Sequence, residues 1–148
     1  MQAPNFSLPS QEQATFSLND ISTDYCVLYF YPKDMTSGCA QQAQDFRDYN
    51  AKFVSNNCTI IGISPDSVAS HIKFIDKYAL PFTLLADTEK QMCQDYGVWQ
   101  EKSMYGKKYF GVVRTTFLLD KSRNIIKRWD KVKVKQHVSD VYDYLSSL

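Results

Sequence analysis

The chain has 148 residues, of which 44% are hydrophobic and 14% aromatic, enough apolar material for one compact domain over residues 1–148. Its formal charge of +1, from 17 basic and 16 acidic residues, gives no reason to expect nucleic acid or an anionic membrane as a partner. Because the chain has neither a basic and apolar leader nor about 18 apolar residues in a row, we expect a cytoplasmic protein without a membrane segment.

The spacing of the apolar residues changes several times along the chain. Continuous apolar runs such as YCVLYFY are typical of strands covered on both faces, whereas apolar residues at every third or fourth position predict a helix. The predicted elements are a strand at 25–31, a helix from 37 or 38 to about 53, a strand at 59–64, a helix from about 67 to 78, a strand at 83–86, a helix from 87 or 88 to 96, strands at 112–119 and 124–129, and a helix at 139–148. This alternation indicates an α/β fold around a mixed sheet.

Cysteine and histidine are too scattered for the commonest metal sites. The four cysteines are Cys26, Cys39, Cys58 and Cys93, and the two histidines are His71 and His137. Without a CxxC pair, a CxxC oxidoreductase is excluded, and we expect no metal site. Cys26 and Cys58 fall in or beside predicted strands and are expected to be core residues, while both histidines are expected to be solvated.

Cys39 lies in the stretch YPKDMTSGC, where a predicted central strand gives way to a helix. Functional residues collect at this place in layered α/β folds. The first turn of a helix has unpaired N–H groups and a positive dipole end, and both stabilise a thiolate. Gly38 allows a close approach to the sulfur, Thr36 can direct a hydroxyl at the same space, and Pro32 stiffens the exit from the strand. By position alone, packing and chemistry are equally open for Cys39.

The pattern Pro32-x-x-x-Thr36-x-x-Cys39 resembles the signature of the peroxiredoxins, and FYPKD-x-T-x-GC is similar to their bacterioferritin comigratory protein (PrxQ) subfamily. Further segments continue the likeness in order: APNFSL at 3–8, GISPDS at 62–67, LPFTLLAD at 80–87 and YGVWQEKSMYGKKYFGVVRTTFLLD at 96–120. The resemblance implies a thioredoxin-like fold, with a central mixed sheet and helices on both faces. It also implies a thiol-dependent peroxidase that reduces hydrogen peroxide and organic hydroperoxides without metal or organic cofactor.

The resemblance assigns roles to four residues. Cys39 would be the peroxidatic nucleophile that becomes a sulfenic acid, Thr36 and Arg114 would be its direct partners, and Pro32 would shield the pocket. Arg114 suits this task because its guanidinium stays charged and offers a fork of donors to the sulfur and the peroxide. The implied partners are a peroxide and a reductant of the thioredoxin, glutaredoxin or glutathione type, and we expect a monomer.

The sequence departs from the subfamily around the same helix. Ser37 stands where Pro is usual, Ala40 where Thr is usual, and Gln42 where a Glu commonly supports the catalytic Arg. Such changes put efficiency in doubt more than reaction type. The two customary places for a resolving cysteine are occupied by Gln44 and Ile75.

Two routes are therefore open for the sulfenic acid. An external thiol can attack it directly, a one-Cys cycle that we favour, or Cys93 in the short predicted helix TEKQMCQDYG can serve as resolving residue if it is exposed and freed by local unfolding.

Other functions and residues have competing interpretations. A slow redox sensor or thiol-dependent chaperone would use the same Cys39, and a structural or binding module is suggested only by Ala40 and Gln42. Lys131, Lys133 and Lys135 are interpreted as a solvated edge. Four residues could border the peroxide pocket or equally be ordinary core residues: Trp99, Met104, Tyr105 and Phe110.

Overall fold

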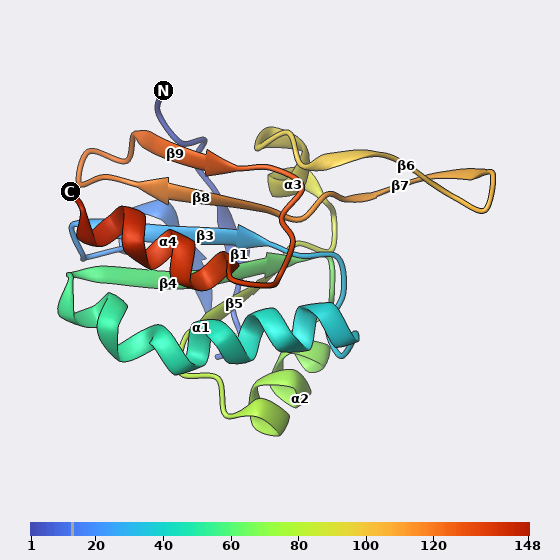
Figure 1. Ribbon diagram of the computed structural model, residues 1–148. Helices are drawn as coiled ribbons and strands as arrows, with labels where there is room; N and C mark the ends of the chain where they lie inside the picture. The colour runs from blue at the N-terminus through green and yellow to red at the C-terminus, as the bar shows by residue number, and fades with distance from the viewer. Residues whose placement is uncertain (13) are drawn as a thin grey trace.

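A five-stranded mixed sheet forms the centre of the computed structural model, which describes residues 1–12 and 14–148 (Figure 1). The strand order is β5–β4–β3–β8–β9, with bounds β3 Tyr25–Phe30, β4 Cys58–Ser64, β5 Thr83–Ala86, β8 Thr115–Leu119 and β9 Ile125–Trp129. The pairs β3–β4 and β4–β5 are parallel, whereas β3–β8 and β8–β9 are antiparallel. The predicted α/β architecture with a mixed sheet is confirmed.

Helices cover both faces of this sheet, unequally. The long helices α1 (Ser37–Ser55), α2 (Val68–Tyr78) and α4 (His137–Ser146) lie on one side, with α1 and α4 side by side in front of the strands (Figure 1). The short helix α3 (Gln91–Asp95), the 3-10 turn η1 (Leu18–Asp20) and the strand pair β1 (Ser7–Pro9) and β2 (Thr15–Ser17) cover the other side. Among the described residues, no helix is both long and apolar enough to pass through a bilayer.

The two covered faces give the chain two apolar cores. Along β3, Val27 and Tyr29 face the core beneath α1, while Cys26, Leu28 and Phe30 face the opposite core. Successive strand residues point to opposite faces, so a strand buried on both sides must be apolar throughout. This explains the unbroken apolar run in the sequence.

The prediction of one continuous strand at 112–119 is wrong. This segment is divided between β7 (Lys107–Val112) and β8, and the break falls at Val113 and Arg114. The Val113 amide N–H donates to the carbonyl of Val98, and the Arg114 carbonyl accepts from the amide of Val132, so neither residue joins the ladder of β8. The break turns the Arg114 side chain away from the sheet and toward α1.

β7 pairs with β6 (Trp99–Met104) in a hairpin that the sequence analysis missed. Its turn uses Tyr105 and Gly106, both with positive φ, and a tyrosine at that place hides the usual Asn-Gly or Asp-Gly signal. The hairpin projects from the body of the molecule (Figure 1). Met104, Tyr105 and Phe110 on it are exposed, so their interpretation as core residues is wrong.

The predicted helix from 87 or 88 is also shorter than expected, because Asp87 stays outside it as a cap. Its carboxylate accepts the amides of Met92 at 3.3 Å and Cys93 at 2.8 Å, and the left-handed backbone of Lys90 (φ 60°) delays the first helical residue to Gln91.

Candidate active site

Cys39 occupies the third position of α1, directly after the loop that leaves the central strand β3. Thr36 is the N-cap of this helix, and its carbonyl accepts the amide of Ala40 at 2.8 Å. Cys39 therefore belongs to the first turn of a long helix, the end that has unpaired N–H groups and the positive end of the helix dipole. Cys39 is only 1% exposed, so bulk water does not screen these effects.

Arg114 reaches the sulfur from the break between β7 and β8. Its Nη2 donates to Cys39 Sγ at 3.2 Å and its Nη1 donates to Gln42 Oε1 at 2.5 Å. A Cβ at Gly38 would lie 3.4 Å from the same Nη2, in van der Waals contact, so the guanidinium packs directly over the backbone of this residue. Two residues 75 positions apart in the sequence are thus brought into direct contact, with the planar fork held between two acceptors.

Gln42 accepts a hydrogen bond from Arg114, although the subfamily pattern commonly has a Glu at this position. It lies one turn after Cys39, is fully buried, and offers a neutral oxygen where a carboxylate would share the charge of Arg114. Within the described residues its Nε2 has no hydrogen-bond partner. The arrangement leaves the full positive charge of the guanidinium to the Cys39 sulfur.

Thr36 and Pro32 lie where the sequence analysis expected them, in the loop before α1. The hydroxyl of Thr36 donates to the carbonyl of Lys33 at 2.8 Å, which leaves its oxygen lone pairs to accept another hydrogen bond. The Thr36 side chain is exposed and makes no capping bond to the first turn of α1, so the structure does not bring its hydroxyl into hydrogen-bond contact with Cys39. Pro32 is half-buried, just after the end of β3.

Both histidines are buried, so the expectation that they are solvated is wrong. His71 faces inward from α2, where it contacts Asp34. His137 begins α4 against the sheet, with Nε2 2.8 Å from Thr116 Oγ1. Burial, with a smaller effect from the charge of Arg114, lowers the pKa of His137 to about 4, so its ring is neutral at neutral pH.

The other three cysteines lie in the cores. Cys26 and Cys58 are buried, as predicted, and burial raises the pKa of Cys58 to about 12. Cys93 is 0% exposed, so the exposure that the alternative two-Cys route requires is absent from this structure. Burial, followed by the nearby Asp87 carboxylate, raises the pKa of Cys93 well above its usual range. It packs in the core opposite to that of Cys39, so the sheet separates the two thiols.

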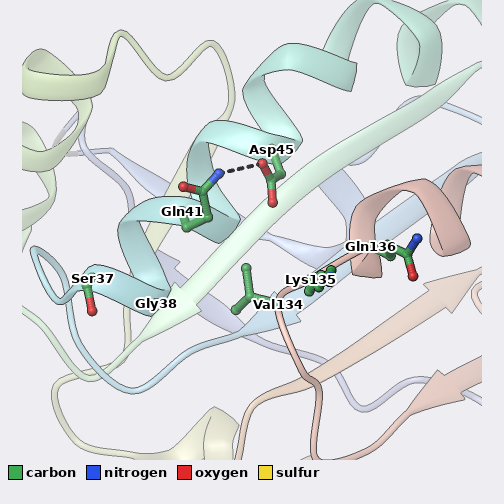
Figure 2. Close-up of a pocket in the computed structure, with 7 residues that line it drawn as sticks. All are labelled: Ser37, Gly38, Gln41, Asp45, Val134, Lys135 and Gln136. Carbon is green, nitrogen blue, oxygen red and sulfur yellow. Dashed lines mark hydrogen bonds between the residues drawn. The ribbon is translucent and has the colours of Figure 1, made fainter.

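A cavity of about 520 Å³ borders the first turns of α1 (Figure 2). Its lining comes from α1 and from the segment that leads into α4: Ser37, Gly38, Gln41, Asp45, Val134, Lys135 and Gln136. Gly38 is the lining residue next to Cys39. Thr36, Cys39 and Arg114 are not themselves among its lining residues. The residues of the β6–β7 hairpin do not contribute to its lining.

Comparisons with known proteins agree with this geometry. The sequence profile of the AhpC/TSA family matches residues 1–128. Peroxiredoxin Bcp of Bacillus subtilis is 46% identical over 147 residues, covering 99% of this chain and 94% of the relative. The chain belongs to the peroxiredoxins of the Bcp (PrxQ) type. Peroxiredoxin Bcp of Escherichia coli is 39% identical over 143 residues, covering 97% and 92%.

Solved peroxiredoxins of this type have the same fold. The bacterioferritin comigratory protein of Xanthomonas campestris, solved in a study of its alkyl peroxide reduction activity, superposes with a TM-score of 0.91 at 34% identity, covering 96% of this chain and 90% of that one. The predicted thioredoxin-like fold is confirmed. As a peroxiredoxin, the chain is a thiol peroxidase, an oxidoreductase that reduces a peroxide and is restored by a thiol reductant.

Proposed function

We propose that Cys39 is the peroxidatic nucleophile of this peroxiredoxin, that Arg114 and Thr36 bind the peroxide, and that Pro32 shields the sulfur. The observation that supports this most is the 3.2 Å contact between Arg114 Nη2 and Cys39 Sγ at the first turn of α1. The helix dipole and the Arg114 guanidinium both stabilise negative charge on the Cys39 sulfur. Burial strengthens both effects because little water screens them.

The first half of the cycle is a displacement at oxygen. The Cys39 thiolate attacks one oxygen of ROOH in line with the O–O bond; a sulfur–oxygen bond forms and the O–O bond breaks. The sulfur is oxidised by two electrons to a sulfenate, the alkoxide that leaves takes up the peroxide proton to become ROH, and a proton from solvent converts the sulfenate to the sulfenic acid. Arg114 stabilises the negative charge as it passes to the leaving oxygen, and Thr36 accepts a hydrogen bond from the peroxide O–H.

The second half returns the sulfur to the thiol. A reductant thiol attacks the Cys39 sulfenic acid, water leaves, and a mixed disulfide forms. A second reductant thiol attacks this disulfide and releases the Cys39 thiol together with an oxidised reductant. We propose a thioredoxin-type or a glutaredoxin- or glutathione-type donor for these thiols.

The one-Cys cycle is our proposal because each other cysteine is remote from the sulfenic acid. Cys26 and Cys93 pack on the far side of the sheet. Cys58 shares the near core but follows the far end of α1, a helix of 19 residues that spans roughly 28 Å. A disulfide needs Cα atoms within about 7 Å, so a bridge to any of them requires large unfolding.

Cys93→Ser is expected to leave peroxidase turnover unchanged, because resolution comes from an external thiol. Steady-state peroxide consumption with dithiothreitol and with a thioredoxin system measures this, and peptide mapping of the peroxide-treated protein shows which thiols are linked. A Cys39–Cys93 peptide in the wild type, together with loss of turnover in Cys93→Ser, would favour a two-Cys cycle instead.

We propose organic hydroperoxides as substrates besides hydrogen peroxide, with the organic group in the cavity beside Gly38. The alkyl peroxide activity named for the Xanthomonas relative and the size of the cavity support this. Gln41→Trp would fill the cavity from α1. It is expected to lower kcat/KM for cumene hydroperoxide by tenfold or more, on the order of 1.4 kcal/mol, without changing kcat/KM for hydrogen peroxide.

Ala51→Trp, an exposed site on the same helix outside the cavity, is the matched control and should change neither value. Equal losses with both peroxides in Gln41→Trp would argue against this substrate site.

We further propose that this peroxidase works as a cytoplasmic monomer of one domain; the single central sheet with an apolar core on each face supports the one-domain organisation. A fast cycle with a thioredoxin system distinguishes the peroxidase from a redox sensor or chaperone on the same fold. Sustained consumption of peroxide supports the enzyme. A single turnover that stops at oxidised Cys39 with every thiol donor would support the sensor.

A further inference from the structure

We infer that His71 is a positioning residue for the peroxidatic loop, residues 31–36, and that it acts through Asp34. The inference rests on the proposed role of Cys39, because this loop carries Thr36 and leads into the first turn of α1. Neither Asp34 nor His71 touches the sulfur; they hold the segment that presents it.

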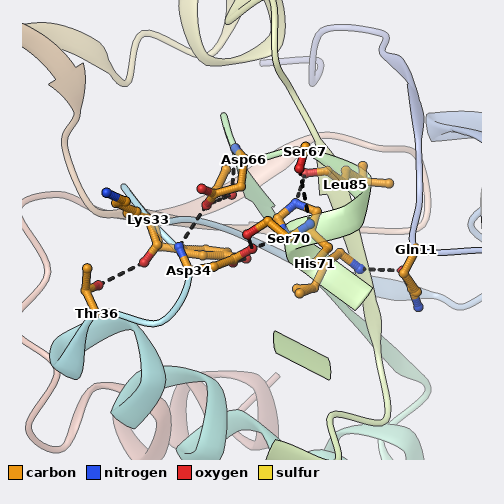
Figure 3. Close-up of polar contacts among 12 residues, drawn as sticks. Gln11, Lys33, Asp34, Thr36, Asp66, Ser67, Ser70, His71 and Leu85 are labelled. Atoms are coloured by element: carbon orange, nitrogen blue, oxygen red, sulfur yellow. Dashed lines mark hydrogen bonds and ion pairs between the residues drawn. The ribbon is translucent and has the colours of Figure 1, made fainter. Parts of the chain in front are cut away.

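Asp34 is a buried carboxylate inside the loop, and three donors surround it (Figure 3). Its Oδ2 lies 2.7 Å from His71 Nδ1 and accepts the hydroxyl of Ser70 at 2.8 Å, both from α2. Its Oδ1 accepts the hydroxyl of Tyr31 at 2.6 Å. The side chains of His71 and Asp34 are 0% and 1% exposed, so losing one partner would leave the other buried and unpaired.

The proton count of the pair follows from the other end of the imidazole. His71 Nε2 lies 3.0 Å from the carbonyl oxygen of Leu85, which can only accept, so Nε2 carries a hydrogen. Nδ1 and the Asp34 carboxylate then share one further proton, and the pair as a whole is neutral. His71 thereby ties the loop to β5 as well as to α2.

Asp66 lies near this pair, but these three residues form a hydrogen-bonded clamp and not a site for a cation. The Asp66 Oδ2 accepts the Ser64 hydroxyl at 2.7 Å and the Asp34 amide at 2.8 Å, so it is engaged by donors of the protein. Both the backbone and the side chain of Asp34 are therefore fixed to the segment 64–71.

The loop needs such a clamp because its own backbone is strained. Met35, between Asp34 and Thr36, has φ 67°, a left-handed conformation that disfavours a side chain such as methionine. Its side chain is exposed, so packing does not hold it there. Releasing Asp34 lets the loop relax, which moves Thr36 and the first turn of α1 relative to Arg114. Displacements of about 1 Å at a reacting centre can cost on the order of a hundredfold in rate.

Two amide variants of His71 separate its two contacts. In His71→Asn the amide nitrogen stands near the place of Nδ1 and can still donate to Asp34. In His71→Gln the amide reaches the place of Nε2 and keeps only the contact with Leu85. By stopped flow, His71→Gln is expected to oxidise Cys39 tenfold or more slowly than wild type, and His71→Asn within about threefold of it.

Phe53→Leu is the matched control for lost packing, because Phe53 is fully buried in the same core near the C-terminal end of α1, where its aromatic neighbours are Phe46 and Tyr142 and not residues of the loop. It should lower the free energy of unfolding without slowing oxidation. His71→Gln combined with Thr36→Val should cost less than the sum of the two changes, because both act on the geometry at Thr36.

Equal rate losses in His71→Asn and His71→Gln, wild-type rates in both, or full additivity with Thr36→Val would overturn the inference. If the His71 variants do not fold, Ser70→Ala removes another donor to the same Asp34 oxygen. An unchanged oxidation rate in Ser70→Ala would then count against the clamp, and a slower rate would support it. Cys39→Ser tests the proposed nucleophile independently of the clamp. If Cys39→Ser is inactive while His71→Gln oxidises as fast as wild type, only the positioning role of His71 is refuted.

Discussion

Cys39→Ser is expected to abolish peroxide reduction. A serine hydroxyl at this position is far less acidic than a thiol, and its oxygen cannot take up an oxygen atom from the peroxide as sulfur does in forming a sulfenic acid. Neither the helix start nor Arg114 can compensate for that loss, because both act only by stabilising charge. Peroxide consumption in the presence of dithiothreitol should fall to the rate without enzyme.

Cys58→Ala is the matched control, since Cys58 is a buried thiol in the same core as Cys39. It should retain the wild-type rate at a temperature where it is folded. Peroxide consumption by Cys39→Ser above the background would mean that another thiol is the nucleophile.

Arg114→Lys is expected to slow the oxidation of Cys39 by tenfold or more, on the order of 1.4 kcal/mol in activation free energy. A lysine keeps one positive charge but cannot donate to Cys39 Sγ and Gln42 Oε1 at once through a planar fork. Stopped-flow measurement of the second-order rate constant tests this. Thr36→Val should have a similar effect and Thr36→Ser a mild one, because serine retains the hydroxyl.

Arg123→Lys provides the comparison for the same chemical change at a purely structural arginine. Arg123 donates to the carbonyls of Ile21 and Thr23, away from the first turn of α1. This variant should lower stability while leaving the oxidation rate unchanged. If Arg114→Lys oxidised as fast as wild type, Arg114 would have only a structural role.

The sequence predicts best those elements in which the spacing of apolar residues matches the faces that are buried. β3 and β4 are apolar throughout because both faces of the sheet are covered, and α1 shows its apolar stripe plainly. The β6–β7 hairpin was missed because most of its residues are exposed and no core imposes an alternation of apolar and polar residues. An element of this kind leaves little trace in the hydrophobic pattern.

The buried histidines had a signal that could have been found. His71 precedes Phe74 by three positions and Ile75 by four, so it shares the apolar face of α2. His137 likewise precedes the buried Val141 by four positions in α4. Cys93 stands three positions before the buried Tyr96, a spacing that argues for the core rather than for solvent.

The contacts of the site could not be derived from local pattern. The resemblance pointed to Arg114 as a partner of Cys39, but the break that aims it depends on hydrogen bonds to Val98 and Val132, far away in the sequence. The bond from Arg114 to Gln42 also depends on this tertiary arrangement. Nothing in the local pattern distinguishes Asp34 from an ordinary loop residue, and only its place against α2 reveals the clamp with His71.

The most direct test of the central claim is the mass of tryptic peptides after one equivalent of hydrogen peroxide, with dimedone present to trap a sulfenic acid. The peptide that carries Cys39 should bear the dimedone adduct in the wild type, in Cys93→Ser and in Cys58→Ala, and far less of it at short times in Arg114→Lys. An adduct or disulfide centred on Cys93, with Cys39 unmodified while peroxide is consumed, would contradict the assignment of Cys39 as the nucleophile.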